Sequence, residues 1–234
     1  MFYKKALFTL AAILLLGVSG LSAGDTATFA DLGFSPDGRT YMFGQYGVQS
    51  GTLRPWADIF IVDVPRNNFV SGGRVSYIHD RAVVSGHDGS GALFQLITRN
   101  ASLTERHRID HCLQGQPLFI ALDNADLTPG TAPIEFRDFT AGASYRATLV
   151  PQIEGSGASL RSSFYINLER TARDGSRRTY TVGTPQFRRP LITSYHIRRV
   201  MVAPHDGSMI FVIEMRRREG ANTSIRYMVE ALQL

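Results

Sequence analysis

Two stretches of the chain decide its fold, FSPDGRTYMFGQYG at 34–47 and APHDGSMIFVIEM at 203–215. In each, an Asp-Gly turn preceded by a proline is followed at once by a run of apolar and aromatic residues. This order is typical of a β-hairpin. The two ends of the chain are therefore expected to form antiparallel hairpins.

Strand-like segments also fill most of the chain between these ends. In ADIFIVDV at 57–64, apolar residues occupy both alternating sets of positions, which indicates a strand buried on both faces. One short helix is expected near 88–108, with Asp88 as its cap and with Leu93, Leu96 and Ile97 at helical spacing. A second short turn with a capping-box pattern starts at Ser102. The sequence thus predicts a mainly β, antiparallel protein. The further expected strands are LFIAL at 118–122, PIEFRDF at 133–139, SYRATLVPQIE at 144–154, SSFYINLER at 162–170, RRTYTVG at 177–183, ITSYHIRRVMVAP at 192–204 and SIRYMVEAL at 224–232.

Two arrangements of these strands fit the sequence. The stretch between Gly38 and Gly207 has room for four repeats of about 40–45 residues, the length of a propeller blade. No clear copies of the motif stand between them, however. A β-propeller-like ring and a β-sandwich with its terminal hairpins side by side therefore both remain open.

The first 24 residues resemble a secretory signal. Lys4 and Lys5 precede an apolar run from 6 to 18, and a tract of mostly small residues follows at 19–24. The apolar run is shorter than the roughly 20 residues that span a bilayer. We expect 1–24 to be a signal peptide and 25–234 to be a single all-β secreted domain. The expected location is secreted or periplasmic, with no transmembrane segment in the mature chain.

Cysteine and lysine are both scarce. Cys112 is the only cysteine, so no intramolecular disulfide can form. The 25 basic residues include only two lysines, Lys4 and Lys5, and the predicted mature domain carries arginine alone. Two explanations of this composition are open. One is codon bias, and the other is recognition of carboxylate or phosphate by the planar guanidinium group.

The arginines gather in the C-terminal half. Nine lie between Arg161 and Arg199, against only Glu169 and Asp174. We expect some of them to form a positive patch that binds an acidic partner, and the alternative is a solvated face balanced by nearby carboxylates. Neighbouring residues of an extended strand point to opposite sides, so only part of the set can share a face. The candidate binding residues are Arg173, Arg177, Arg178, Arg188, Arg189, Arg198 and Arg199.

Catalytic and metal-binding motifs are weak. The segment HRIDHC supplies His107, His111 and Cys112, which are zinc-ligand types, but a structural zinc site needs a fourth ligand. We therefore expect no metal and no cofactor. The predicted mature domain contains no Gly-x-Ser-x-Gly elbow; the pattern occurs once, as GLSAG at 20–24, inside the predicted signal peptide. Arginines interleaved with aromatic residues could stack on nucleic acid, but export argues against such a partner.

Two resemblances follow from these motifs. The unit FSPDGRTYMF with ADIFIVDV resembles a blade of the β-propellers in periplasmic Tol-type proteins, which implies a propeller-like fold. A closer resemblance extends over nearly the whole chain. With its signal-like start and the blocks FADLGFSPDGRTYMFGQYGV, IFIVDVPRNNFV, SYRATLVPQIEG and IRYMVE, the chain is similar to a bacterial family of predicted secreted proteins of unknown function. That resemblance implies secretion.

Two functions remain open on this basis. The first is a non-catalytic envelope protein that binds a protein, a glycan or an anionic surface through its arginine-rich C-terminal half. The second is a secreted hydrolase whose site cannot be recognised from sequence. A deep pocket holding a histidine and carboxylates with shifted pKa values would favour the hydrolase, and a shallow arginine-lined face would favour the binding protein.

Overall fold

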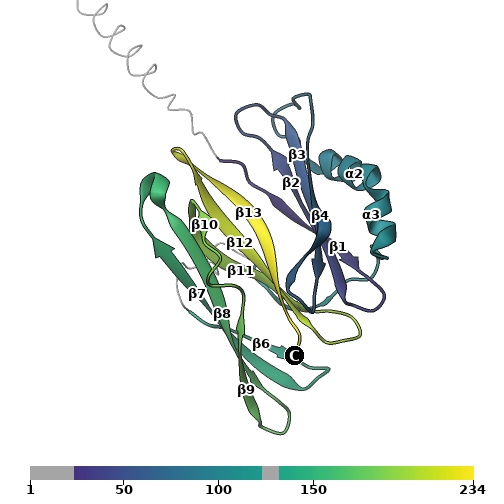
Figure 1. Cartoon of the computed structure of the whole chain (residues 1–234), viewed down its shortest axis with the longest axis vertical. Helices are drawn as coiled ribbons and strands as arrows, with labels where there is room; N and C mark the ends of the chain where they lie inside the picture. Colours follow the sequence, from purple (N-terminus) through teal and green to yellow (C-terminus); the bar gives the residue numbers. More distant parts are fainter. Residues whose placement is uncertain (1–23, 123–131) are drawn as a thin grey trace, which may run out of the picture.

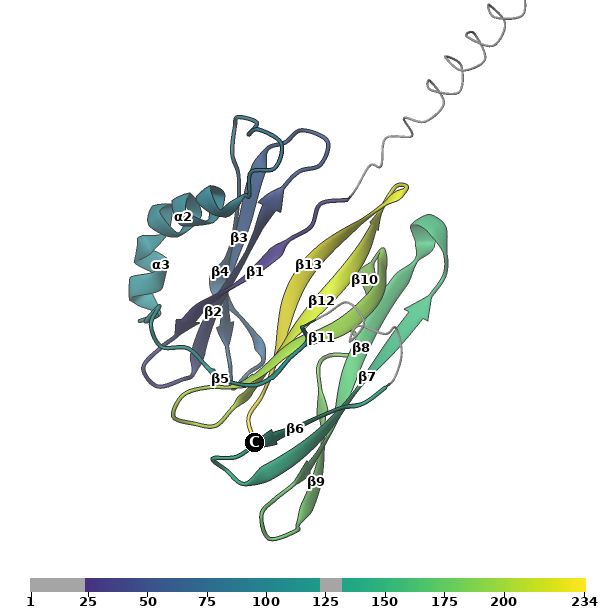
Figure 2. The ribbon, with the colours of Figure 1, turned by 180° about the vertical axis from the view of Figure 1, so that it is seen from behind.

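Three antiparallel sheets stack face to face, and two helices cover the outside of the first (Figures 1 and 2). The computed structural model describes residues 24–122 and 132–234. The predicted signal peptide therefore lies outside the described residues, except for Gly24.

The N-terminal sheet has the strand order β1-β2-β3-β4, so each strand pairs with the next along the chain. Helices α2 (Ser90–Arg99) and α3 (Ala101–Arg106) follow this sheet in the chain. The strands are β1 (Thr28–Phe34), β2 (Thr40–Val48), β3 (Pro55–Asp63) and β4 (Asn68–Ile78).

The central sheet has the order β13-β12-β11-β5. Strands β11, β12 and β13, the last three of the chain, form a meander. The outer sheet is built around the long hairpin of β7 and β8, with β6 on one side and β9 and β10 on the other. The central strands are β5 (Gln116–Ile120), β11 (Ile192–Val202), β12 (Met209–Glu219) and β13 (Asn222–Leu232). The outer sheet comprises β6 (Ile134–Asp138), β7 (Ala143–Glu154), β8 (Arg161–Thr171), β9 (Arg177–Val182) and β10 (Arg189–Pro190), with the short helix η2 (Gly157–Ser159) between β7 and β8.

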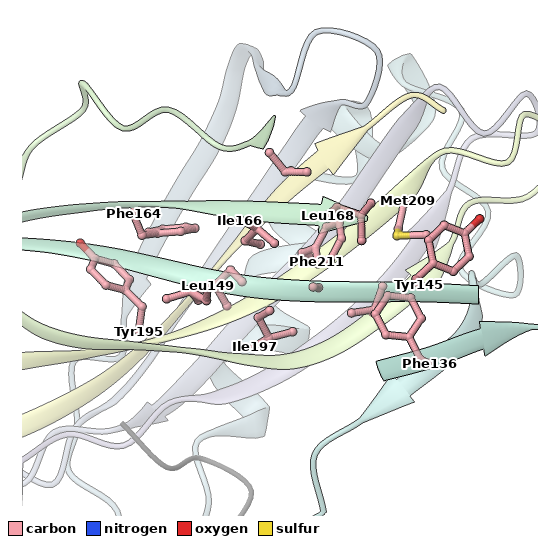
Figure 3. Packing of buried hydrophobic residues seen from close by; sticks show 14 of the residues in the cluster. Phe136, Tyr145, Leu149, Phe164, Ile166, Leu168, Tyr195, Ile197, Met209 and Phe211 are labelled. Atoms are coloured by element: carbon pink, nitrogen blue, oxygen red, sulfur yellow. The ribbon is translucent and has the colours of Figure 1, made fainter. Parts of the chain in front are cut away.

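Strand β12 shows why its sheet is the middle layer. The run from Met209 to Glu214 is buried at every position. Met209, Phe211 and Ile213 pack in one cluster with the outer sheet, as Figure 3 shows for Phe211, Met209, Phe164 and Ile166. Ile210 and Val212 pack in a second cluster with the N-terminal sheet. Because side chains alternate along a strand, a continuous apolar run suits a sheet covered on both faces.

Strand β3 is likewise buried on both faces, as its alternation predicts. Phe60 and Val62 contribute to the cluster shared with the central sheet. Ile59 and Ile61 face the opposite way and pack with Leu93 and Leu96 of α2. The helix therefore supplies the fourth layer of the molecule, because it covers an apolar sheet face that would otherwise meet water.

The two Asp-Gly stretches at 34–47 and 203–215 lie against each other. Gly38, in the first turn, has a φ of +71° and stands so close to the Pro204 carbonyl of the second turn that a Cβ atom would collide with it. Phe34, Tyr41 and Phe43 then pack with residues of β12 and β13. Of the two arrangements that the sequence left open, the described structure therefore has the sandwich with adjacent terminal hairpins.

The prediction of a mainly antiparallel β-fold is confirmed, and the described residues form no closed propeller. The single short helix predicted near 88–108 is broken at Asn100 into α2 and α3. The capping-box pattern at Ser102 does not mark the start of the second helix, because the N-cap of α3 is Asn100, two positions earlier, and Ser102 lies inside the helix. Among the described residues, no helix is long and apolar enough to cross a membrane.

Candidate functional site

The β8–β9 hairpin presents three of the predicted arginines at its end. Its turn is closed by the Ala172 amide, which donates to the Ser176 carbonyl at 2.8 Å. Asp174 accepts a hydrogen bond from the Ser176 amide at 2.9 Å. The interactions with Ser176, through its side chain and then its backbone, lower the pKa of Asp174. The only carboxylate of the turn is thus engaged in holding the turn together.

Arg173, Arg177 and Arg178 are exposed around this turn. None of them has a carboxylate within 4.0 Å among the described residues. Tyr180 packs on the core, so alternation places Arg178 on the inner face of the hairpin and Arg177 on the outer face. The positive charge therefore surrounds the end of the hairpin rather than one of its faces.

A second turn, between β6 and β7, lies beside the first. Ser144, next to that turn, pairs with Thr171 at the end of β8. Gly142 lies against the aliphatic part of Arg173. A Cβ atom at Gly142 would stand about 3.3 Å from Cδ of Arg173. The strand register and this contact place the two turns together at one end of the outer sheet, below the other sheets in Figure 1.

Phe139 is the most exposed large apolar residue of the described chain, with an exposed fraction of 82%. The buried Asp138 carboxylate fixes the turn that carries it, accepting hydrogen bonds from the Thr140 and Ala141 amides at 2.8 and 2.9 Å. The Arg137 guanidinium lies 5.4 Å from the centre of the Phe139 ring, within the range of a cation–π contact. We refer to Arg137, Phe139, Arg173, Arg177 and Arg178 as the basic tip.

The other four predicted arginines do not belong to this tip. Each has a carboxylate beside it: Arg188 lies 2.9 Å from Glu154, Arg189 3.7 Å from Glu230, Arg198 3.7 Å from Glu214, and Arg199 3.8 Å from Asp31. Arg188 and Arg189 lie next to the opposite end of β8, where β10 pairs with Ser162 and Arg161.

Arg198 and Arg199 also depart from the simple alternation. The register between β11 and β12 shifts between Ile197 and Arg199, so the strand carries a β-bulge there. As a result, both guanidinium groups lie on the side facing the N-terminal sheet. Arg198 reaches Glu214 of β12 there, and Arg199 reaches Asp31 of β1. A bulge adds one residue to a strand and so lets two neighbours share a side. The expectation that these two side chains point to opposite sides is wrong for this reason.

The nearest approach to a catalytic arrangement lies on β11. Ser194 Oγ is 3.2 Å from Nε2 of His196, and His196 pairs across the ladder with Glu214. Burial lowers the pKa of His196, with the Arg216 charge as the next cause. Glu214 is held by Arg216 at 3.2 Å and by Arg198 at 3.7 Å. No hydrogen bond joins His196 to Glu214 in the described structure, so this carboxylate does not orient the imidazole as a catalytic triad requires.

The three metal-ligand candidates, His107, His111 and Cys112, do not form a metal site in the described structure. His111 Nδ1 lies 2.6 Å from the Leu32 carbonyl oxygen. Cys112 is exposed as a free thiol, and His107 caps the end of α3. Within residues 24–122 and 132–234, no three His, Cys, Asp or Glu side chains gather closely enough to hold a metal ion.

Apart from the tip, an open cleft of about 490 Å³ lies at the edge of the central sheet. Its walls come from the β3–β4 turn, the β9–β10 connection and strand β13. It contains the buried Glu230, whose pKa is raised by burial, but no histidine. The combination expected of the hydrolase is therefore incomplete in this cleft. Sequence reasoning did not find Phe139, Arg137 or this cleft. The motif FRDF at 136–139 contains Arg137 and Phe139 on either side of the turn-forming Asp138.

Comparison with known proteins agrees with the longer of the two resemblances. No curated protein and no solved structure matches the chain. A family model described as "Predicted secreted protein (DUF2259)" matches residues 42–233. This match covers all three sheets apart from β1 and part of β2. The chain therefore belongs to this family of predicted secreted proteins, whose function is unknown.

Proposed function

We propose that the protein is a non-catalytic secreted binding protein that attaches to an anionic membrane surface through the basic tip. The observation that carries the proposal is the neighbourhood of Phe139, 82% exposed, and arginines that have no carboxylate partner in the described structure. The transfer of an exposed aromatic ring from water into the interface of a bilayer is favourable, and guanidinium groups pair with lipid phosphates. A tip with both features suits a lipid surface better than water.

The geometry supports an end-on approach. Arg177 and Arg178 leave the two faces of the hairpin, and Arg173 lies at its turn. A flat partner that met one face of the outer sheet would contact only part of this set. A surface that met the end of the sheet would contact all three arginines and Phe139 together. The strands would then stand steeply on the membrane.

The size of the effect follows from the charges. Each arginine near an anionic surface contributes about 1 kcal/mol at low ionic strength. Removing three should therefore weaken vesicle binding by about a hundredfold. The attraction should fall as salt rises, because the Debye length shortens from about 30 Å at 0.01 M to about 10 Å at 0.1 M.

The test is co-sedimentation of the 25–234 domain with vesicles of phosphatidylcholine, with and without phosphatidylglycerol. The wild type should bind only the anionic vesicles. The variant Arg173→Ser/Arg177→Ser/Arg178→Ser should lose that binding. The matched control, Arg39→Ser/Arg81→Ser/Arg106→Ser, removes the same charge from exposed arginines elsewhere and should keep it.

Two results would overturn the proposal. The first is a wild type that ignores anionic vesicles at low salt, which would point to a protein or glycan partner instead. The second is equal binding by the tip variant and the control, since net charge alone would then explain attachment. Circular dichroism and urea unfolding should show that both variants fold, because the substituted side chains are exposed.

A further inference from the structure

The cleft at the edge of the central sheet has a strand edge as its floor. Met228, Val229 and Glu230 of β13 line it, between a wall that carries Phe69 and Arg74 and a wall that carries Phe187 and Arg189. In Figure 1, β13 borders the N-terminal sheet on one side and the layer of β8 and β10 on the other. A molecule in the cleft would therefore touch all three sheets.

Most of the open edge of β13 is occupied by other parts of the chain. The Ile225 amide donates to the Asp25 carbonyl at 2.9 Å. The Tyr227 amide donates to Gln45 Oε1 at 2.8 Å, and the Ala231 amide donates to Asn67 Oδ1 at 2.7 Å. In an antiparallel strand, every second residue directs its N–H and C=O to the same edge. These odd-numbered residues therefore define the edge that faces away from β12.

Val229 belongs to the same set and stands between two of these contacts. Among the described residues, the Val229 amide donates no hydrogen bond on this edge, and Val229 lines the cleft. Two side-chain amides, Gln45 and Asn67, thus flank one open position of the strand edge. A backbone N–H that faces a cleft without a partner favours a ligand with an amide or carbonyl oxygen.

The walls supply the remaining chemistry. Phe69 is 38% exposed and Phe187 is 60% exposed. The Arg74 guanidinium lies 5.1 Å from the Phe69 ring and 5.8 Å from the Phe60 ring. Within the described residues, Arg74 has no carboxylate within 4.0 Å. Arg189, by contrast, is held between Glu230, Phe164 and Phe187.

We propose that this cleft binds the carboxyl-terminal end of an extended peptide as a short strand added to β13. The peptide backbone pairs with the open edge at Val229, apolar side chains cover Phe69 and Phe187, and the terminal carboxylate pairs with Arg74. Glu230 repels a carboxylate placed over the floor and so directs it towards the Arg74 wall. Gln45 and Asn67 occupy the strand edge at Tyr227 and Ala231, on either side of Val229. Because a strand rises about 3.3 Å per residue, the space between them limits the added strand to about two or three residues. This site is independent of the basic tip.

The test is an NMR titration of the isotope-labelled 25–234 domain. The probe is a pool of N-acetylated tripeptides with apolar residues at every position and a free terminal carboxylate. The same pool with an amidated terminus, and sodium phosphate alone, serve as comparison probes. We expect saturable shifts of the Val229 amide with the free-acid pool, and binding at least about tenfold weaker with the amidated pool.

The variant Arg74→Gln should weaken binding of the free-acid pool to the level of the amidated pool, whereas Arg81→Gln should change neither. Equal affinity of the two pools for the wild type would overturn the proposal without any variant. Shifts that leave Val229 unmoved would also overturn it. Phosphate that reproduces the peptide shifts would reduce the site to one for a small anion and would equally contradict it.

Discussion

Asn67 should stabilise the packing of the N-terminal sheet against the edge of the central sheet. It lies in the β3–β4 turn with a φ of +47°, a left-handed conformation that asparagine tolerates better than most residues. Its Nδ2 donates to the buried Glu230 carboxylate at 2.6 Å, and its Oδ1 accepts from the Ala231 amide at 2.7 Å. One side chain therefore satisfies two polar groups from a strand 163 and 164 residues away in sequence.

The expected cost of removing it follows from these contacts. A hydrogen bond to a neutral amide contributes about 0.5–1.5 kcal/mol, and one to a charged group about 1.5–3 kcal/mol. Asn67→Gly should therefore lower the free energy of unfolding by about 2–4 kcal/mol. Asn67→Ala should cost about 1 kcal/mol more, because alanine is strained in the left-handed region and glycine is not.

Urea unfolding of the 25–234 domain, followed by tryptophan fluorescence, measures both values. Trp56 is buried in β3 and provides the signal. Asn67→Asp is a useful third variant, because it keeps the shape but places a second carboxylate beside Glu230. It should be at least as destabilising at neutral pH as Asn67→Gly. A loss below about 1 kcal/mol for Asn67→Ala, or a larger loss for glycine than for alanine, would refute this reasoning.

Three further outcomes are expected. Phe211→Ala should lower the free energy of unfolding by about 3–5 kcal/mol in urea titrations, because Phe211 is fully buried between the central and outer sheets, whereas the exposed Phe187→Ala should cost under about 0.5 kcal/mol. His196 has a pKa lowered mainly by burial, so the unfolded chain takes up its proton near pH 6.5 before the folded chain does. Stability should therefore fall as pH drops from about 7 to 5, and His196→Gln should reduce that loss in thermal melts; an unchanged pH profile would contradict it. Cys112 is exposed, and a thiol reagent should label one equivalent in the native protein without denaturant, whereas labelling only after unfolding would contradict its placement.

The sequence predicts the strands of this fold better than their arrangement. The apolar run of β3 indicates burial on both faces, and the structure confirms it with α2 on one side and the central sheet on the other. The Asp-Gly turns likewise predict hairpins at both ends of the chain. These features are local, since turn chemistry and alternation act within a few residues.

The stacking of the sheets could not be derived in the same way. The contact of Asn67 with β13 joins residues 164 positions apart, and no local pattern encodes it. The bulge at Arg198 depends on how β11 pairs with β12 and reverses the side that alternation alone assigns. For the candidate site, the sequence placed Arg173, Arg177 and Arg178 among seven candidate arginines. The adjacent Phe139 is 34 or more positions away and is brought there by the pairing of β7 with β8.

The most direct test of the proposed function places a reporter at the centre of the basic tip. In Phe139→Trp, the new indole is expected in water, because the native ring is 82% exposed, while Trp56 is buried and gives a constant background. On addition of phosphatidylglycerol vesicles at low salt, its emission should shift to shorter wavelength, and lipids brominated along their chains should quench it. Phosphatidylcholine vesicles should cause neither change. Emission that stays unshifted and unquenched while the protein sediments with the anionic vesicles would show that another surface binds, and would contradict the account.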